Sequence, residues 1–218
     1  MLLLSCILLL ATASCVIVHG PTGPHPVTYT IKALTDEARW DPLAPTSEPH
    51  KRRILVSIFS PLDIEEASDC QLAEPLPYLP PATAAQYTVI LESLGLPPYL
   101  LDDFKLQFCE SPSVKEEALS SELPVIIFSP GFSNTRLLSS AQAQSLASYG
   151  YTVITVDHPY DATIVEFPNK EVTYSFNISD ANDEISEQLV EVNFTMRKTH
   201  LRPKLTPTDP SGRYIISY

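Results

Sequence analysis

The sequence predicts an α/β fold in which a mostly parallel sheet is flanked by helices. The main observation is the order strand, turn, helix, glycine, strand between Leu123 and Val156, the pattern of a βαβ unit. A second is the uninterrupted apolar character of Leu123–Ser129, which indicates a strand covered on both faces. Apolar residues make up 44% of the 218 residues, which is enough to bury a core. We therefore expect one α/β domain with a right-handed crossover.

Residues 1–20 are predicted to be a secretory signal peptide. An apolar run from Leu2 to Val18 contains Ala11-Thr12-Ala13, which has the A-x-A pattern of a cleavage site. The run is nearly long enough to span a bilayer and no Lys or Arg precedes it, so an uncleaved anchor stays open as an alternative. In either case the rest of the chain is expected to be extracytoplasmic. We expect a secreted, extracellular protein.

The next segments predict two strands and a helix. Gly20–His50 is rich in proline and is expected to be an extended lead-in with one short strand. Arg52–Ser60 is β-branched and apolar and stops at Pro61, which predicts a strand. Pro81 and Gly95 mark the first residue and the end of a helix, because proline suits the first helical turn and glycine the position after the last.

Cysteine usage predicts one disulfide in the domain. Cys6 and Cys15 belong to the signal segment, which leaves Cys70 and Cys109 as a pair. An even number of cysteines in an oxidising compartment favours a disulfide between them. The bond would fasten a long surface loop to the layer formed by the strands and the helix.

The second half continues the α/β pattern and then changes. Ser139–Tyr149 is a helical stretch that Gly150 ends, and Tyr151–Val156 predicts a third strand. Asp180–Met196 has apolar residues spaced for one face of a helix. The domain is therefore predicted to span residues 21–196.

Residues 197–218 are expected to be an atypical basic tail that does not belong to the domain. The segment holds five basic residues and one acidic residue, whereas the whole chain holds 14 basic and 26 acidic residues. It also contains three prolines and no clear apolar period. Before the tail, Asn177 and Asn193 begin N-x-S/T sequons, which predicts glycosylation of a secreted chain.

Charge and composition exclude some classes of function. A net charge of −12 argues against nucleic acid as the main partner. The histidines and cysteines are not clustered, so no metal site is predicted. His25, His50 and His200 lie in proline-rich or basic surroundings and are expected to be surface residues.

The break at Ser129-Pro130-Gly131 is the candidate site. A buried strand that ends at a glycine-centred turn before a helix leaves backbone N–H groups in the cleft above the carboxyl ends of the strands, where open α/β sheets bind ligands. Such donors can stabilise a developing oxyanion. A glycine after a strand is more often simple turn geometry, so the local pattern alone leaves both interpretations open.

Longer stretches carry a resemblance to a known family. They are PTGPHPV, WDPLAPTSEPHKRRILVSIFSP, YLPPATAA and LPVIIFSPGFSNTRLLSSAQAQSLASYGYTVITVDHPYDAT. Together they cover most of Pro21–Glu191 and resemble the secreted fungal members of the platelet-activating-factor acetylhydrolase family, α/β-hydrolase serine esterases also called 1-alkyl-2-acetylglycerophosphocholine esterases. The resemblance implies a partial α/β-hydrolase fold, hydrolysis of the short acyl ester of a phospholipid, and no cofactor.

The resemblance also implies roles for particular residues. The residue after the glycine of this turn supplies an oxyanion-hole amide in the family, and here it is Phe132, after Gly131. Pro130 stands where many relatives have histidine and has no N–H, so the donors at this turn are the amides of Gly131 and Phe132. The segment DHPY resembles the one that lines the cleft, which makes His158 and Tyr160 cleft-lining residues.

The nucleophile of such an esterase is missing from the sequence. A serine esterase of this fold needs a G-x-S-x-G elbow, followed along the chain by an acid and a histidine, and none of the six glycines brackets a serine in this way. A triad of Ser133, His158 and Asp157 is disfavoured, because adjacent strand residues point to opposite faces. Ser129 and Ser133 flank the turn, where a nucleophile would crowd the donors. Asp157 is better explained as a strand-end residue that satisfies backbone N–H groups.

The sequence therefore predicts a fold truncated before the nucleophile elbow and a chain that is inactive as it stands. The triad histidine is expected to be absent together with the nucleophile. Two alternatives stay open, namely a non-catalytic secreted lipid-binding or decoy half-domain and another α/β-hydrolase carboxylesterase. The expected partner is a phospholipid substrate, with contact to a membrane surface or lipid aggregate and with neither nucleic acid nor a protein partner.

Overall fold

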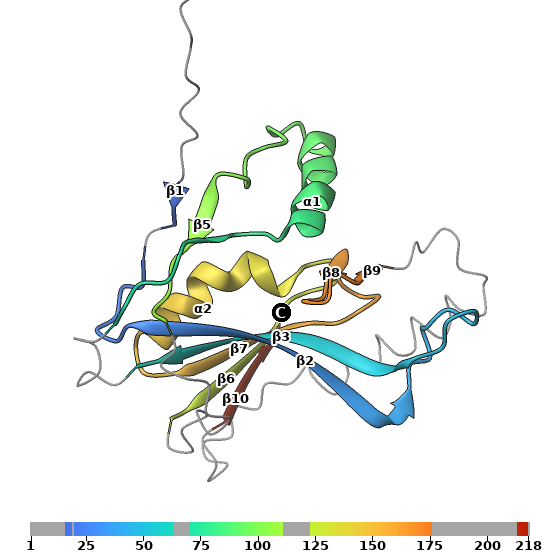
Figure 1. The fold of residues 1–218 in the computed structure, drawn as a ribbon, viewed down its shortest axis with the longest axis horizontal. Coiled ribbons are helices and arrows are strands. Elements are labelled where there is room, and N and C mark those ends of the chain that lie inside the picture. Colours follow the sequence, from blue (N-terminus) through green and yellow to red (C-terminus); the bar gives the residue numbers. More distant parts are fainter. Residues whose placement is uncertain (1–15, 19, 63–69, 111–122, 176–212, 218) are drawn as a thin grey trace, which may run out of the picture.

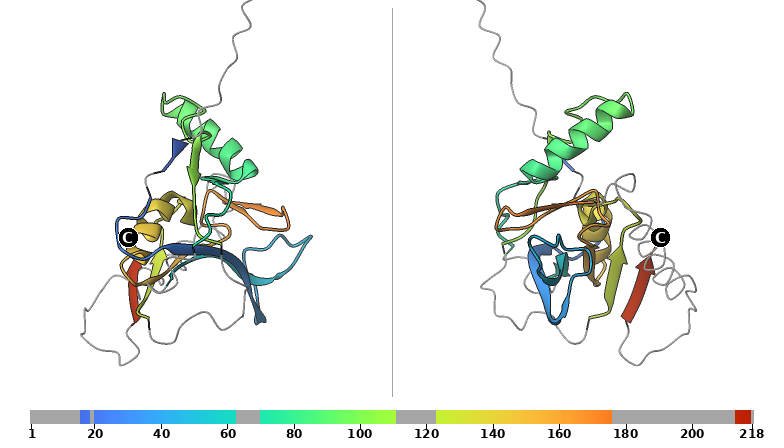
Figure 2. Two further views of the ribbon diagram at one scale, coloured as in Figure 1. Left: turned by 60° about the vertical axis from the view of Figure 1, so that its left-hand side comes forward. Right: turned by 90° about the vertical axis from the view of Figure 1, so that its right-hand side faces the viewer.

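The computed structural model describes residues 16–18, 20–62, 70–110, 123–175 and 213–217. Its centre is a five-stranded sheet with the order β10-β6-β7-β3-β2. These strands are β2 (Val27–Trp40), β3 (Lys51–Pro61), β6 (Val125–Ser129), β7 (Thr152–Asp157) and β10 (Arg213–Ser217). Helix α2 (Ser140–Ala147) lies against one face of the sheet, and α1 (Pro81–Ser93) stands further out on the same side (Figures 1 and 2). The predicted α/β class is confirmed.

The central sheet is mixed. β6 pairs in parallel with β7 on one side and with β10 on the other. β3 pairs antiparallel with both β7 and β2. The parallel part contains the βαβ unit that the sequence predicts, because β6 leads through a 3-10 helix, Arg136–Ser139, and α2 into β7. The antiparallel part arises because β2 and β3 form a hairpin, so the sheet is less parallel than expected.

Strand β2 is much longer than the short strand that the sequence predicts. It has 14 residues and pairs with β3 from Val27 opposite Pro61 to Trp40 opposite Lys51, with an irregularity after Asp36. Its second half is exposed, so the alternation that marks a strand in the sequence fades there. The hairpin extends this far because β3 offers backbone partners along its whole length.

The prediction that β6 is covered on both faces is wrong for the described structure. Ile126 is its buried residue, and the other four are half-buried. In the described part of the chain, both α-helices lie on one side of the sheet (Figures 1 and 2). The apolar run in the sequence therefore predicts the strand correctly but overestimates the cover on its second face.

Strand β10 lies inside the segment 197–218, where the sequence predicts no regular element. Its five residues, RYIIS, pair with β6 from Arg213 opposite Val125 to Ser217 opposite Ser129. Tyr and Ile favour strands, but five residues after a proline-rich stretch give too short a pattern to stand out. The rest of this tail, the predicted helix at 180–196, Asn177, Asn193 and most of the predicted signal peptide lie outside the described residues.

The helix ends follow the sequence signals. α1 begins with Pro81 in its first turn and is followed by Gly95 at a φ of 73°, and Gly150 follows α2 at a φ of 95°. Positive φ is accessible to glycine without strain, which explains why both helices stop there. No helix among the described residues has the length and apolar character that crossing a membrane requires.

The described residues also form two smaller sheets. β1 (Val16–Ile17), β5 (Phe104–Leu106) and β4 (Leu76–Pro77) form one sheet, in the order β1-β5-β4, and β8 (Ile164–Glu166) pairs antiparallel with β9 (Val172–Tyr174). The main core joins the central sheet to α2 and to the segment around β5. It consists of Val27, Phe59, Leu106, Phe108, Ile126, Ala143, Ala147 and Val153.

The predicted disulfide between Cys70 and Cys109 is confirmed. Cys109 is buried, and its N–H donates to the carbonyl of Val27 at 3.0 Å. The bond therefore fastens the segment at Cys70 to the first residue of β2, next to the main core.

We expect the Cys70→Ser/Cys109→Ser double variant to lower the free energy of unfolding by about 2 to 4 kcal/mol, because the bond closes a loop with a sequence separation of 39 residues. Urea unfolding monitored by circular dichroism measures the change. Adding a reductant to the native chain should reproduce the loss, whereas it should leave the double variant unaffected. An equal response of both proteins to the reductant would contradict this role.

Candidate functional site

Two loops meet at the carboxyl ends of β6 and β7. The amide of Ser133 donates to the carbonyl of Asp161 at 3.1 Å, and the hydroxyl of Thr163 donates to the carbonyl of Ser133 at 2.6 Å. Ser133 has a φ of 63°, a conformation uncommon outside glycine, and it forms a bridge with Ala162. The predicted turn after β6 is therefore joined to the loop that carries His158 and Tyr160.

The structure brings Ser129 and His158 together. Ser129 Oγ lies 2.8 Å from His158 Nε2, and both residues are half-buried. Ser129 ends β6 and His158 follows β7, so their meeting results from the parallel pairing of these strands. The sequence predicts His158 as a cleft-lining residue but gives no indication of its partner.

Asp157 lies completely buried beneath this edge. Its Oδ1 accepts from the backbone N–H of Arg136 at 2.5 Å and from the Thr135 hydroxyl at 3.1 Å, and its Oδ2 pairs with the Arg136 guanidinium. The prediction that Asp157 satisfies a backbone N–H is confirmed. The Ser133, His158 and Asp157 triad, which the sequence disfavours, does not form, because the carboxylate is engaged by Arg136 and His158 meets Ser129.

Arg136 is a residue that the sequence analysis missed. It is only 2% exposed although it is charged, and its Nε donates to Ser57 Oγ at 2.9 Å. Ser57 Oγ in turn lies 3.0 Å from the hydroxyl of Tyr29, on β2. The guanidinium thus connects the turn after β6 to β7, β3 and β2. The sequence signal was weak, since an arginine at the start of a helix is usually solvated.

The amides of Gly131 and Phe132 remain available. Within the described part of the chain neither donates a hydrogen bond, whereas the amides of Ser133 and Asn134 donate to the carbonyls of Asp161 and Gly131 at 3.1 Å. Phe132 is 44% exposed, so this part of the turn is open to solvent. Two adjacent unpaired N–H groups at the carboxyl end of a strand are suited to bind an oxyanion.

Tyr160 is held beside the site by a histidine. Its hydroxyl lies 2.8 Å from His50 Nε2, and His50 Nδ1 lies 2.9 Å from the carbonyl of Lys51. Burial raises the pKa of the Tyr160 phenol, and the carboxylate of Asp41 raises it further.

His25 and His50, which are expected to be surface residues, are partly exposed and have hydrogen-bond partners. Both are half-buried, and His25 Nδ1 lies 3.0 Å from the carbonyl of Leu62. Their partners lie in loops distant along the sequence, which local composition does not indicate. His200 lies outside the described residues.

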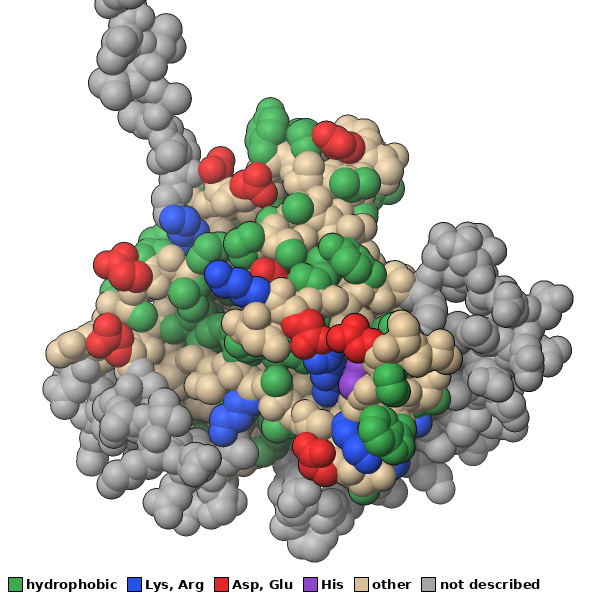
Figure 3. Space-filling view, turned by 45° about the vertical axis from the view of Figure 1, so that its right-hand side comes forward, with side chains coloured by type: hydrophobic (Ala, Val, Ile, Leu, Met, Phe, Trp, Pro, Cys, Tyr) green, Lys and Arg blue, Asp and Glu red, His purple; other side chains and the backbone are tan. Residues whose placement is uncertain are grey.

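An ion pair joins the β8–β9 hairpin to the central sheet. Arg53 Nη1 donates to Glu171 Oε2 at 2.7 Å, and the guanidinium lies 4.3 Å from the centre of the Phe167 ring. Hydrogen bonds from Arg53 hold the pKa of Glu171 below its ordinary value. Acidic and basic side chains lie side by side on this face of the molecule, around a histidine (Figure 3).

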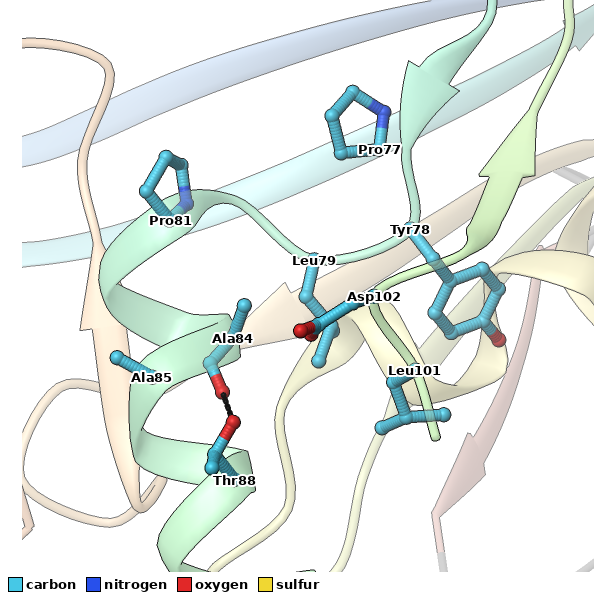
Figure 4. A pocket seen from close by; sticks show the side chains of 9 residues that line it. All are labelled: Pro77, Tyr78, Leu79, Pro81, Ala84, Ala85, Thr88, Leu101 and Asp102. Carbon is cyan, nitrogen blue, oxygen red and sulfur yellow. Dashed lines mark hydrogen bonds between the residues drawn. The ribbon is translucent and has the colours of Figure 1, made fainter. Parts of the chain in front are cut away.

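A cavity of about 350 Å³ lies elsewhere, beside α1 (Figure 4). Its lining is mixed: most of the residues are apolar by type, but backbone groups, the carboxylate of Asp102 and the hydroxyl of Thr88, which donates to the carbonyl of Ala84 at 3.1 Å, make it as polar as apolar. None of the residues of the turn or of the Ser129–His158 pair lines it. Among the described residues, no group of three or more His, Cys, Asp or Glu residues could hold a metal ion.

The fold and the turn fit one class of protein. A sheet containing a βαβ unit, whose strand-end turn carries two amides that are unpaired among the described residues, is an arrangement found in α/β hydrolases. The sequence profile described as "Platelet-activating factor acetylhydrolase, isoform II" matches residues 54–205. The chain belongs to this family.

The chain is similar to proteins that include a fungal esterase and a bacterial esterase of known structure. A "Probable 1-alkyl-2-acetylglycerophosphocholine esterase" from Arthroderma benhamiae is 33% identical over 172 residues, which are 76% of this chain and 43% of that protein. The chain thus spans less than half the length of this relative. The solved structure of a ferulic acid esterase from Streptomyces cinnamoneus has a TM-score of 0.56 and 21% identity over 93% of this chain and 54% of its own, which supports the fold alone.

We expect Asp157→Asn to lower the free energy of unfolding by about 3 to 5 kcal/mol, because it leaves the charge of Arg136 buried without its partner. Urea unfolding measures the change. Asp36→Asn is the matched control, since Asp36 pairs with Arg39 at the surface and should leave the unfolding midpoint unchanged. Similar midpoints for the two variants would show that the buried pair does not fix the turn.

We expect Glu171→Gln to reduce stability at neutral pH and to have little effect in acid. The lowered pKa of Glu171 means that its ion pair with Arg53 stabilises the fold above the ordinary value of 4.5, and that this contribution is lost as the pH falls through the folded pKa. Urea midpoints at several pH values measure the difference between native chain and variant. Glu92→Gln, at the exposed end of α1, is the control; a difference that persists in acid would refute the link.

Proposed function

We propose that the chain is the N-terminal part of a secreted serine esterase that hydrolyses the short acyl ester of a phospholipid in lipid catabolism. One observation carries the proposal: the amides of Gly131 and Phe132 at the carboxyl end of β6 have no acceptor among the described residues, in a chain that belongs to the acetylhydrolase family. The substrate class is supported by the name of the Arthroderma relative, an alkyl-acetylglycerophosphocholine esterase.

In the proposed reaction, an activated serine attacks the ester carbonyl and forms a tetrahedral intermediate. The carbonyl oxygen becomes an oxyanion, to which the amides of Gly131 and Phe132 donate hydrogen bonds. Removal of one such donor lowers kcat about 100-fold to 1000-fold in other serine hydrolases. The 218 residues contain no G-x-S-x-G, so they do not supply the nucleophile of this reaction. What this chain supplies is the two amide donors and the residues that hold them in place.

Strand β10 indicates where the nucleophile of a longer product would lie. It runs parallel to β6 and ends at the same edge, with Ser217 opposite Ser129. A serine on a turn after a strand in this position would come next to the two amides, as the nucleophile elbow of this fold requires. The 218 residues alone are accordingly proposed to be inactive toward phospholipids.

Secretion and lipid contact belong to the same proposal. The Cys70–Cys109 disulfide supports an oxidising, extracellular environment, in agreement with the predicted signal peptide and the sequons at Asn177 and Asn193. Contact with a lipid aggregate is supported by exposed apolar side chains on and after α1, on the projecting part of the molecule (Figure 3). These side chains are Val89, Leu94, Leu96, Tyr99 and Leu100.

One alternative has its own support. The lack of an elbow in the 218 residues fits a non-catalytic lipid-binding or decoy protein that keeps the cleft but performs no hydrolysis. This alternative predicts a soluble chain that binds phospholipid without releasing the acyl group.

The test begins with the mRNA, sequenced from the codon of Asn193 to its 3′ end. We expect a reading frame with a G-x-S-x-G motif and later an Asp and a His. The longer product should release acetate from a 1-alkyl-2-acetylglycerophosphocholine, whereas the 218-residue chain should not. A transcript that stops after Tyr218 would overturn the esterase proposal and favour the binding alternative.

The role of the turn is tested in that longer product. Phe132→Pro removes the amide N–H and should lower kcat about 100-fold with little change in KM. Phe132→Ala keeps the N–H, so it separates the loss of the side chain from the loss of the amide and should cause a smaller decrease. Equal decreases for the two variants would argue against an oxyanion hole at this turn.

A further inference from the structure

The hydrogen bond between Ser129 and His158 joins a hydroxyl to an imidazole, the combination that activates serine nucleophiles. The separation of 2.8 Å between Ser129 Oγ and His158 Nε2 is within the range of a nucleophile and its general base. Both residues are half-buried, so a small reagent can reach them. The esterase proposed above makes no use of this pair.

Other hydrogen bonds also hold the two loops together. Ser133 already binds the second loop through the carbonyl of Asp161 and the hydroxyl of Thr163. Asp157 also fastens the turn to the end of β7 through the backbone and side chain of Arg136. Because these bonds already contribute to the geometry of the sheet edge, the Ser129–His158 bond can serve in chemistry as well as in structure.

We propose that Ser129 and His158 form a nucleophilic dyad in this chain, which accepts small activated acyl or phosphonyl groups on Ser129. His158, with Nε2 unprotonated, removes the proton of the Ser129 hydroxyl while Oγ attacks the carbonyl carbon or the phosphorus. The bond to the leaving group breaks, and the leaving group departs with its electron pair. The unpaired amides of Gly131 and Phe132 follow in the same turn and are the donors for the charged oxygen.

Ser129 is proposed as a nucleophile although a serine here is expected to crowd these donors. The hydroxyl of Ser129 hydrogen-bonds to His158, which follows the neighbouring strand β7, while the two amides that are unpaired among the described residues come later in the turn. The cavity beside α1 shares no lining residue with the dyad, so a small reagent that needs no large pocket is the appropriate probe. The dyad and the proposed phospholipid esterase share the amides of Gly131 and Phe132 but differ in their nucleophile, since the serine of the esterase is proposed to follow a strand in the position of β10.

The experiment uses the 218-residue chain and an alkyl fluorophosphonate. Oγ–P bond formation releases fluoride, and tandem mass spectrometry identifies the modified residue. We expect modification at Ser129, at a rate at least tenfold above that in 8 M urea, where the dyad is lost. His158→Ala should slow the reaction about 100-fold, and added imidazole should restore part of the rate. Ser129→Ala should abolish it, whereas Ser133→Ala, in the same turn, should react like the native chain.

The outcomes separate this inference from the esterase proposal. Equal modification of Ser129 in buffer and in urea, or modification at another residue, overturns the dyad whether or not the longer product is an esterase. An unchanged rate in His158→Ala, with native circular dichroism, also overturns it. Modification of Ser129 in the 218-residue chain supports the dyad even if the longer product proves inactive toward phospholipids.

Discussion

The buried ion pair between Arg136 and Asp157 is the constraint on which the edge of the sheet depends. Arg136 is 2% exposed and Asp157 is fully buried, so separating them would leave a charge without water or partner. Such a pair contributes little net stability, because desolvation offsets the attraction, but it strongly disfavours arrangements that break it. The hydrogen bond from Arg136 to Ser57 extends the same constraint to β3. The pair therefore fixes where the turn after β6 lies.

The free amides of the site follow from this arrangement. Asp157 accepts a hydrogen bond from the N–H of Arg136, and the carbonyl of Asp161 accepts one from the N–H of Ser133. These amides in the later part of the turn therefore have acceptors. Gly131 and Phe132 lie between the end of β6 and these anchors, and their amides have no acceptor in the described part of the chain. Donors that are held in place but unpaired need no reorganisation when a charge develops nearby. The buried Arg136–Asp157 pair thus helps to hold the two amide donors in a fixed position for an oxyanion.

Local sequence signals predicted where helices end, but they did not predict which distant side chains come into contact. Pro81, Gly95 and Gly150 mark helix ends through their own backbone preferences, which depend on few neighbours. The partner of His50 is Tyr160, which is 110 residues away, and only the strand order brings the two together. The same holds for Ser129 and His158. Since strand register decides which side chains meet, a single sequence predicts the position of a site better than its contacts.

The half-buried state of β6 connects the fold to the site. In an α/β sheet covered by helices on both faces, a strand at this position is buried throughout, whereas here Ile126 alone is buried on β6. The Arthroderma relative has more than twice the length that this chain matches, so it possesses additional chain that could cover such a face. The candidate oxyanion donors lie at the end of this same strand. An element that covers the second face of β6 as far as Ser129 would lie next to the turn, because the turn follows this residue directly.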